Sequence, residues 1–249
     1  FLLTITSWQN IWIAISILVL ILLPIISFSL IKKLKLDSRE SLKNHNEEID
    51  TNIKQWTRSE VIRDYRFYIL SLNMLSMPSI ATGVFVYQSF IVSSKNWGPF
   101  IMAQSFMVYS ILSVITLSVS GFLIDKYTSR KLLIYMNIPL FISTIVLLLF
   151  NSPFSSFIFL GLIGITNGFA NILGSSTWAE IYGVKYIGSI KALTGGLMVF
   201  ATATGTAVFG ILIDAGYSIN SIAIFSSVYI GIIVLLLFFF RKKIQPIYI

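Results

Sequence analysis

The chain has 249 residues, of which 56% are hydrophobic and 11% are charged, with a mean hydropathy of +0.85. A soluble domain carries about 25% charged residues, so this composition excludes an ordinary soluble protein and indicates one embedded in lipid. The sequence contains no cysteine, which excludes disulfides and thiolate chemistry.

A membrane-spanning helix needs roughly 20 mainly apolar residues, and seven stretches of the chain meet that requirement. In chain order they are residues 8–31, 67–92, 99–124, 132–150, 156–178, 192–213 and 219–240. Each is too long and too uniformly apolar for a transmembrane β-strand, which alternates over about 10 residues. The expected fold is therefore all-α, with seven transmembrane helices.

Residues 32–66 differ from every other connection because they are rich in both acidic and basic side chains. Such a segment buries too little apolar surface to order itself fully, although a short surface helix is expected near 56–66. The expected domains are thus a transmembrane helix over 1–31, a charged central loop over 32–66, and a six-helix transmembrane unit over 67–249.

The net charge is +8, and the positions of the basic residues along the chain indicate the membrane topology. If the connections alternate between two sides, all of the 18 Lys and Arg residues except Lys95 fall on one side. The positive-inside rule makes that side cytoplasmic, which places the loop 32–66 and the C-terminus in the cytoplasm of a cell (plasma or inner) membrane. The lipid bilayer is the expected partner of the protein, and no nucleic acid is expected.

A short string occurs twice. GFLID, at 121–125, ends the second of the last six stretches, and GILID, at 210–214, ends the fifth. Dividing the six into 67–150 and 156–240 places the two strings at equivalent positions but on opposite sides of the membrane. This pattern predicts two inverted three-helix repeats, an arrangement found in one group of secondary transporters.

These residues carry a family resemblance. GFLIDKYTSRK, at 121–131, resembles the Gly-x-x-x-Asp-Arg/Lys-x-Gly-Arg-Arg/Lys loop motif of the major facilitator superfamily, with Thr128 at the position of the motif's second glycine. WAEIYGVKYIGSIKAL (178–193), GTAVFGILIDAGY (205–217) and TGVFVYQSFIVSSKNW (82–97) are similar to the tenth-to-eleventh and seventh helices of its bacterial monocarboxylate and oxalate/formate branch.

The resemblance implies that the stretch 8–31 is the sixth helix of such a transporter and that 67–249 is its C-terminal half. It implies a missing N-terminal half as a further partner. The implied function is secondary active transport of a small solute, with a monocarboxylate or other organic anion as a candidate, by alternating access. A coupled proton or counter-solute would accompany the solute, and no cofactor or metal is expected.

The candidate gating residues belong to the two repeated strings and the facing loop. They are Gly121, Asp125, Lys126, Arg130, Lys131, Glu180, Lys191, Gly210 and Asp214. Asp125 is expected at the end of its helix, where the macrodipole disfavours an anion. The resemblance implies that it latches onto a helix start in the opposite half; the alternative is a charge that only anchors the helix end.

Glu180 and Lys191 flank one cytoplasmic loop, and a structural salt bridge there is a simpler interpretation than substrate contact. Their possible partners are each other, Lys185 or Arg130.

Polar residues at membrane depth are the candidate lining of a solute pathway. They are Asn73, Tyr87, Gln88, Gln104, Tyr109, Asn167 and Asn171. Amides at this depth either join helices or line a cavity, and Asn167 and Asn171, four residues apart, face the same way. Small residues at helical spacing, such as Gly161, Gly164 and Gly168 on one stretch and Gly196 and Gly210 on another, predict close helix packing.

Other function classes fit the sequence poorly. No ionisable residue lies near the middle of a stretch, so a cation for an anionic solute is expected from the other half. The single histidine, His45, lies in the charged loop, and no hydrolytic motif is present, so no enzyme is predicted. The last stretch has no lysine for a retinal Schiff base. A non-transporting sensor or receptor on the same fold remains the alternative to a transporter.

Overall fold

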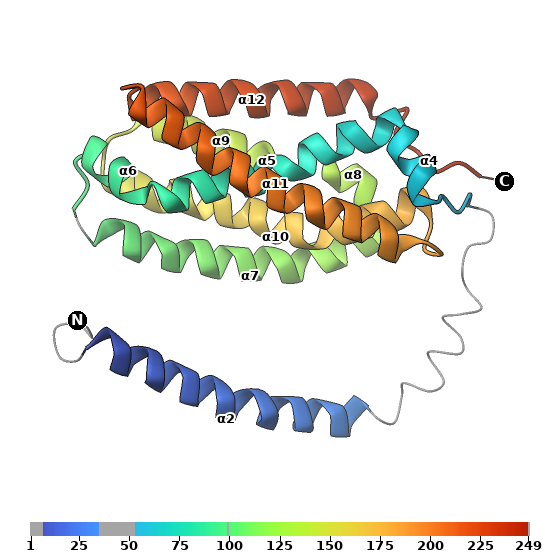
Figure 1. The fold of residues 1–249 in the computed structure, drawn as a ribbon, viewed down its shortest axis with the longest axis horizontal. Helices are drawn as coiled ribbons and strands as arrows, with labels where there is room; N and C mark the ends of the chain where they lie inside the picture. Colours follow the sequence, from blue (N-terminus) through green and yellow to red (C-terminus); the bar gives the residue numbers. More distant parts are fainter. Residues whose placement is uncertain (1–6, 35–52, 99, 249) are drawn as a thin grey trace. The chain divides into compact units, whose positions relative to one another are not determined.

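The computed structural model describes residues 7–34, 53–98 and 100–248. It contains α2 (Trp8–Leu34), α4 (Arg58–Arg63), α5 (Tyr65–Val86), α6 (Gln88–Ser94), α7 (Ile101–Tyr127), α8 (Ser129–Leu133), α9 (Ile138–Leu149), α10 (Phe154–Tyr182), α11 (Ile187–Asp214) and α12 (Ile219–Phe240) (Figure 1). The chain divides into two compact units, Phe1–Thr51 and Asn52–Ile249. His45 and the middle of the expected central loop lie outside the described residues.

In the first unit, α2 is a helix of 27 residues with Pro24 inside it. Its apolar stretch Gln9–Ile25 is flanked by further helical residues on both sides. Large apolar side chains such as Trp12, Leu20 and Phe28 are exposed along it. A helix that is apolar around its whole circumference suits lipid rather than water.

The second unit holds six helical spans that are long and apolar enough to cross a membrane. They are Tyr65–Val86, Ile101–Tyr127, Ser129–Leu149, Phe154–Tyr182, Ile187–Asp214 and Ile219–Phe240. These six spans overlap the last six predicted stretches, and α2, whose apolar stretch is shorter, overlaps the first; the all-α membrane fold is confirmed. The short helix predicted near 56–66 is present as α4.

Two of the predicted stretches are not continuous helices. The stretch 67–92 breaks at Tyr87, which separates α5 from α6, although α5 runs through Pro78 without interruption. The stretch 132–150 breaks between α8 and α9. At this second break Asn137 points its amide Nδ2 at the Asn73 backbone oxygen, 2.7 Å away, and a proline follows at the start of α9. Proline lacks an N–H and favours a helix start, so the helix restarts there.

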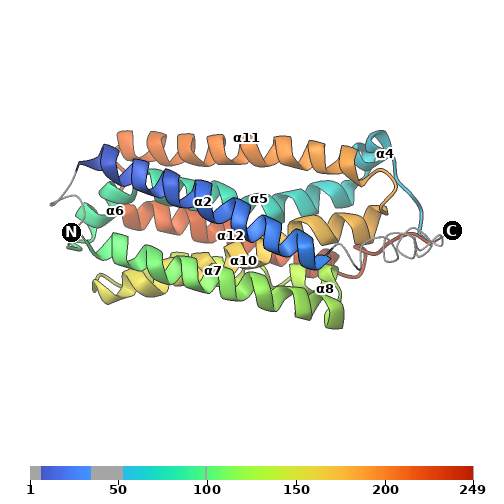
Figure 2. The ribbon, with the colours of Figure 1, turned by 90° about the horizontal axis from the view of Figure 1, so that it is seen from below.

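The six spans pack as two inverted three-helix repeats. The first helix of each repeat packs against the second helix of the other, α5 against α11 and α10 against α7, and the third helices α9 and α12 pack together. Figure 2 shows α5 and α11 running along each other. Asp125 near the end of α7 and Asp214 at the end of α11 lie at opposite ends of the bundle (Figure 1). The repeat predicted from the two strings is confirmed.

Glycines allow these helix pairs to approach closely. A Cβ atom built on Gly164 would lie 3.0 Å from the Tyr109 Cα, and one on Gly168 would lie 2.6 Å from the Ser113 backbone oxygen, both on α7. On α11 the contact glycine is Gly205, against the Ser79 backbone of α5. A Cβ on Gly196 would meet no atom within 4 Å, so this residue makes no close helix contact within the unit. Without a hydrophobic drive between helices in lipid, such close contacts carry the packing.

At one end of the bundle, the buried side chain of Lys95 is hydrogen-bonded to residues from two other parts of the chain. This lysine is 3% exposed, and its Nζ donates to Asn151 Oδ1 at 2.8 Å and to Asn220 Oδ1 at 2.9 Å. Trp97 Nε1 also donates to the Asn151 backbone oxygen, at 3.0 Å. Burial lowers the pKa of Lys95. The cation that the sequence places alone on its side is thus the centre of a network that joins two connections and the start of α12.

At the other end, the residues before α5 are bound to α10 and to the C-terminal tail. Asp64 Oδ2 lies 2.7 Å from Arg66 Nη2 in a buried ion pair and accepts from the Tyr182 hydroxyl at 3.1 Å. Trp56 N donates to the Tyr182 backbone oxygen at 3.0 Å, and Arg66 Nη1 donates to the Gln245 backbone oxygen at 2.6 Å. The part of the charged loop nearest α5 is therefore ordered by the bundle.

Candidate functional site

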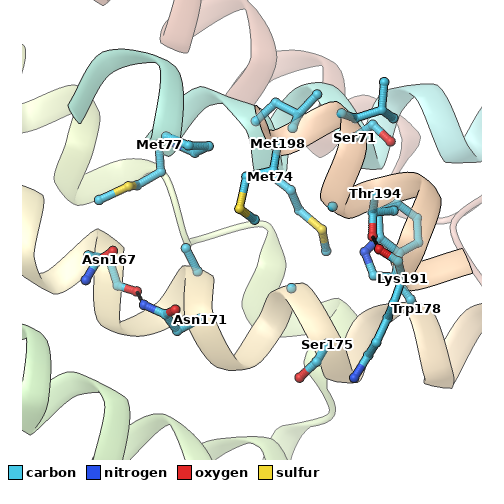
Figure 3. A pocket seen from close by; sticks show the side chains of 16 residues that line it. Ser71, Met74, Met77, Asn167, Asn171, Ser175, Trp178, Lys191, Thr194 and Met198 are labelled. Carbon is cyan, nitrogen blue, oxygen red and sulfur yellow. Dashed lines mark hydrogen bonds between the residues drawn. The ribbon is translucent and has the colours of Figure 1, made fainter. Parts of the chain in front are cut away.

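A cavity of about 340 Å³ lies between α5, α10 and α11 (Figure 3). The polar side chains that line it carry amide, hydroxyl and amine groups. These are Asn167, Asn171, Ser71, Ser175, Thr194 and Lys191, with Met74, Met77, Met198 and Trp178 among the apolar residues around them. Ligand sites are commonly of this kind, mostly apolar with a few polar groups that converge.

Asn167 and Asn171 lie on the same face of α10 and both reach the cavity, as their spacing predicts. Asn167 Nδ2 donates to Ser113 Oγ of α7 at 2.8 Å. Asn171 Nδ2 donates to the Asn167 backbone oxygen at the same distance, 2.8 Å. Asn167 therefore both joins two helices and lines the cavity, whereas Asn171 is exposed and, among the described residues, its side chain bonds only within its own helix.

Lys191 lies near the start of α11, where its side chain lines the cavity beside Thr194 and Trp178 (Figure 3). It is the only charged residue of that lining and, among the described residues, has no ion pair. The salt bridge predicted for Lys191 at the cytoplasmic rim is therefore not formed among the described residues. The position of Lys191 places one cation at the cavity within this six-helix unit.

Glu180, the other charge flanking that loop, pairs with the loop motif. Its Oε1 lies 3.0 Å from Arg130 Nε, and its Oε2 accepts from the Arg130 backbone N–H at 3.2 Å and from the Ser129 hydroxyl. Of the partners that the sequence allows, the structure selects Arg130. Glu180 ties the end of α10 to the turn between α7 and α8.

That turn contains a strained residue. Thr128 has φ 70° and ψ 146°, a conformation that suits glycine and is unusual for a β-branched residue. Its hydroxyl is buried without a hydrogen-bond partner among the described residues. Thr128 stands where the loop motif has glycine, so the backbone keeps the shape of the motif although the side chain does not suit it.

The remaining gating candidates are exposed or half-exposed. Asp125 is exposed on the last turns of α7 and has no hydrogen bond or ion pair within the described residues. A Cβ on Gly121, one turn earlier on the same face, would meet no atom within 4 Å. Asp214 is likewise exposed. Lys126 lies over the Tyr127 ring, Lys131 is exposed, and Gly210 faces the Tyr87 hydroxyl.

The other pathway candidates do not reach this cavity. Asn73 is fully buried, where its backbone and side-chain oxygens accept from Asn137 Nδ2 at 2.7 and 2.9 Å. Tyr109 packs its ring against Phe85 and Phe106. Tyr87 and Gln88 form the junction of α5 and α6, and Gln104 is exposed on α7. Asn73 and Tyr109 thus contact neighbouring helices and do not line this cavity.

The sequence model of the Major Facilitator Superfamily matches residues 1–195 of the chain. No match was found among curated proteins or among solved structures. The match covers well over half of the chain and agrees with the six-span bundle of inverted repeats. The chain is therefore a multi-pass membrane protein of the transporter class, and it belongs to the major facilitator superfamily.

Proposed function

We propose that this chain forms the C-terminal half of a secondary transporter that moves a small organic anion by alternating access. The observation that carries the proposal is the cavity between α5, α10 and α11, in which Lys191 is the only charged lining residue. A lone ammonium beside amide and hydroxyl groups suits a carboxylate, which accepts charge-assisted hydrogen bonds. Monocarboxylates are the first solutes to test, because three segments resemble the monocarboxylate and oxalate/formate branch.

The volume supports a small solute. A cavity of about 340 Å³ is near the lower end of the range for small-molecule sites, roughly 300–1,000 Å³. Asn171 is exposed beside it, so the site is open to groups outside this bundle. A second six-helix half facing α5, α7, α10 and α11 would complete the pathway, and a coupled proton or counter-solute would need a group from that half.

The loop motif supports the gating part of the proposal. Asp125 has no partner within the described residues, and the face around Gly121 is open. An anion in this place is stabilised by the positive N-terminus of another helix. The latch is needed in one state only, so it would shift the equilibrium between inward- and outward-facing forms. The concentration of cations at the Asp125 end supports a cytoplasmic position for that end.

Uptake by the full-length protein tests the proposal. Proteoliposomes would be assayed with radiolabelled lactate, with Lys191→Gln as the test variant and Lys185→Gln as the matched control. Lys185 is an exposed lysine of the preceding loop that does not line the cavity. We expect Lys191→Gln to weaken apparent lactate affinity by about tenfold or more, as for loss of a hydrogen bond to a charged group, and the control to match the unchanged protein.

Lactate binding without uptake would instead favour the alternative, a sensor on the transporter fold. Equal uptake by both variants would remove Lys191 from the solute pathway.

A further inference from the structure

Two adjoining hollows lie between the start of α8 and the end of α12, away from the cavity described above. Their volumes are about 130 and 660 Å³, and both are lined by Lys131, Ile134, Arg241 and Gln245. They form one groove at the end of the bundle that carries the loop motif. The proposed solute pathway uses none of these residues.

The groove is strongly cationic. Its charged lining residues are Arg130, Lys131, Arg241 and Lys242, and no acidic side chain of the described residues lines either hollow. Arg130 has its Nε paired with Glu180, but its Nη1 is buried with no hydrogen-bond partner among the described residues. A buried guanidinium N–H without a partner is costly, and phosphate or carboxylate oxygens are its preferred acceptors. An anion bound in the groove would supply an acceptor of this kind.

The position of the groove indicates where that anion comes from. The span Ser129–Leu149 begins here and the span Ile219–Phe240 ends here, so the cations lie at the level of the lipid headgroups. Tyr127 and Tyr135 line the larger hollow and are 45% and 59% exposed, as tyrosines are at a membrane interface. Phe239, in the last turn of α12, is 82% exposed and suits contact with acyl chains.

We propose that the groove lined by Arg130, Lys131, Arg241 and Lys242 binds the phosphate headgroup of an anionic phospholipid. Basic pockets between membrane helices on the cation-rich side have the chemistry for such headgroups. Free inorganic phosphate offers the same oxygen acceptors. The exposed tyrosines of the groove and Phe238, over whose half-exposed ring Arg241 lies, favour the lipid, because a free ion would not contact these apolar surfaces.

Native mass spectrometry of the full chain tests the proposal. The protein, in micelles with phosphatidylcholine, would be titrated with phosphatidylglycerol. We compare the double variant Lys131→Gln/Arg241→Gln with the matched control Lys185→Gln/Arg63→Gln, which removes one exposed lysine and one exposed arginine from the same end of the bundle. We expect selective retention of phosphatidylglycerol, reduced about tenfold in the first double variant and unchanged in the control.

Two results would overturn the proposal: equal retention of the two lipids, or equal losses in both double variants. A competition arm with inorganic phosphate separates the two sources of the anion. Displacement of phosphatidylglycerol at micromolar phosphate would assign the groove to the free ion, whereas retention in millimolar phosphate supports the lipid. Melting temperatures of both double variants show whether they fold, and the single variant Lys131→Gln, at an exposed position, replaces the double variant if it does not.

Discussion

Arg130 Nε lies 3.0 Å from Glu180 Oε1, and this pair joins the turn after α7 to the last turn of α10. The same carboxylate accepts from the Arg130 backbone N–H and from the Ser129 hydroxyl. Three donors from one turn therefore converge on a single anion. Both side chains are about a quarter exposed, so solvent screens the attraction between the two charges. The hydrogen bonds to Glu180 therefore supply much of the stabilisation.

Replacing Glu180 by Gln should therefore destabilise the bundle by about 1–2 kcal/mol, since a neutral amide accepts these bonds more weakly. Thermal unfolding in detergent, followed by circular dichroism, measures the change. Asp214→Asn is the control, because Asp214 is exposed and has no partner within the described residues. A shift in Glu180→Gln no larger than that of the control would show that the pair has no structural role.

Thr128→Gly should stabilise the protein, by about 1 kcal/mol. A non-glycine residue held in such a conformation costs roughly 1–3 kcal/mol, which exceeds the roughly 0.5–1 kcal/mol of extra unfolded-state entropy that glycine brings. Within the part of the chain that the structure describes, the Thr128 hydroxyl makes no hydrogen bond that would be lost.

Thr128→Ala is the control for this substitution, because alanine removes the hydroxyl but keeps a Cβ at φ 70°. The melting temperature should rise for glycine only. An equal rise in both variants would mean that the unpartnered hydroxyl, and not the backbone, is the source of the cost.

Gly168→Ala should separate α7 from α10. The added Cβ would lie 2.6 Å from the Ser113 backbone oxygen and 2.7 Å from Thr116 Cβ, and a backbone atom cannot move aside cheaply. Overpacking of this kind costs about 1–3 kcal/mol. Gly174→Ala, on the same helix, meets nothing within 4 Å and should be neutral or stabilising because alanine favours a helix. Equal melting temperatures for the two variants would contradict the close approach of α7 and α10.

Glu60 should titrate far below an ordinary glutamate. The backbone N–H of Thr57, 2.8 Å from Glu60 Oε2, and then the Lys54 ammonium, 2.9 Å from Oε1, lower the pKa of Glu60 from 4.5 to about 2. A lowered pKa means that its contribution to the start of α4 is present above pH 4.5 and is lost as the pH falls toward 2. Carbon-detected NMR of the Glu60 carboxyl, assigned with Glu60→Gln, measures the midpoint. A midpoint near 4.5 would show that the capping box does not form.

Much of this fold follows from the sequence because lipid imposes strict rules on the chain. The spans are visible as uninterrupted apolar stretches, and the inverted repeat is visible because Asp125 and Asp214 follow matching strings. Sequence periodicity also places Asn167 and Asn171 on one face. These features depend on local spacing, which a single chain displays directly.

The surroundings of individual polar side chains could not be predicted, because they depend on contacts between residues far apart in the sequence. Asn73 and Asn167 are both amides at membrane depth, yet Asn73 is buried against Asn137 and only Asn167 reaches the cavity. The sequence suggested a salt bridge for Lys191 at the cytoplasmic rim, whereas the structure places its side chain in the cavity lining. The position of a lysine in the sequence does not show where its long side chain points. The burial of Lys95 could not be predicted either, because its two asparagine partners lie 56 and 125 residues away in sequence.

The accessibility of Asn171 tests the central claim, that the cavity between α5, α10 and α11 is a solute pathway. This chain has no cysteine, so within it a single introduced thiol reports alone, and any cysteine elsewhere in the full-length protein is replaced by serine. In proteoliposomes of the full-length protein, Asn171→Cys should react with a membrane-impermeant maleimide, and saturating lactate should slow the reaction. Leu235→Cys, on the exposed apolar face of α12, should not react. If Asn171→Cys reacts no faster than Leu235→Cys, the cavity is closed to water and the pathway proposal is contradicted.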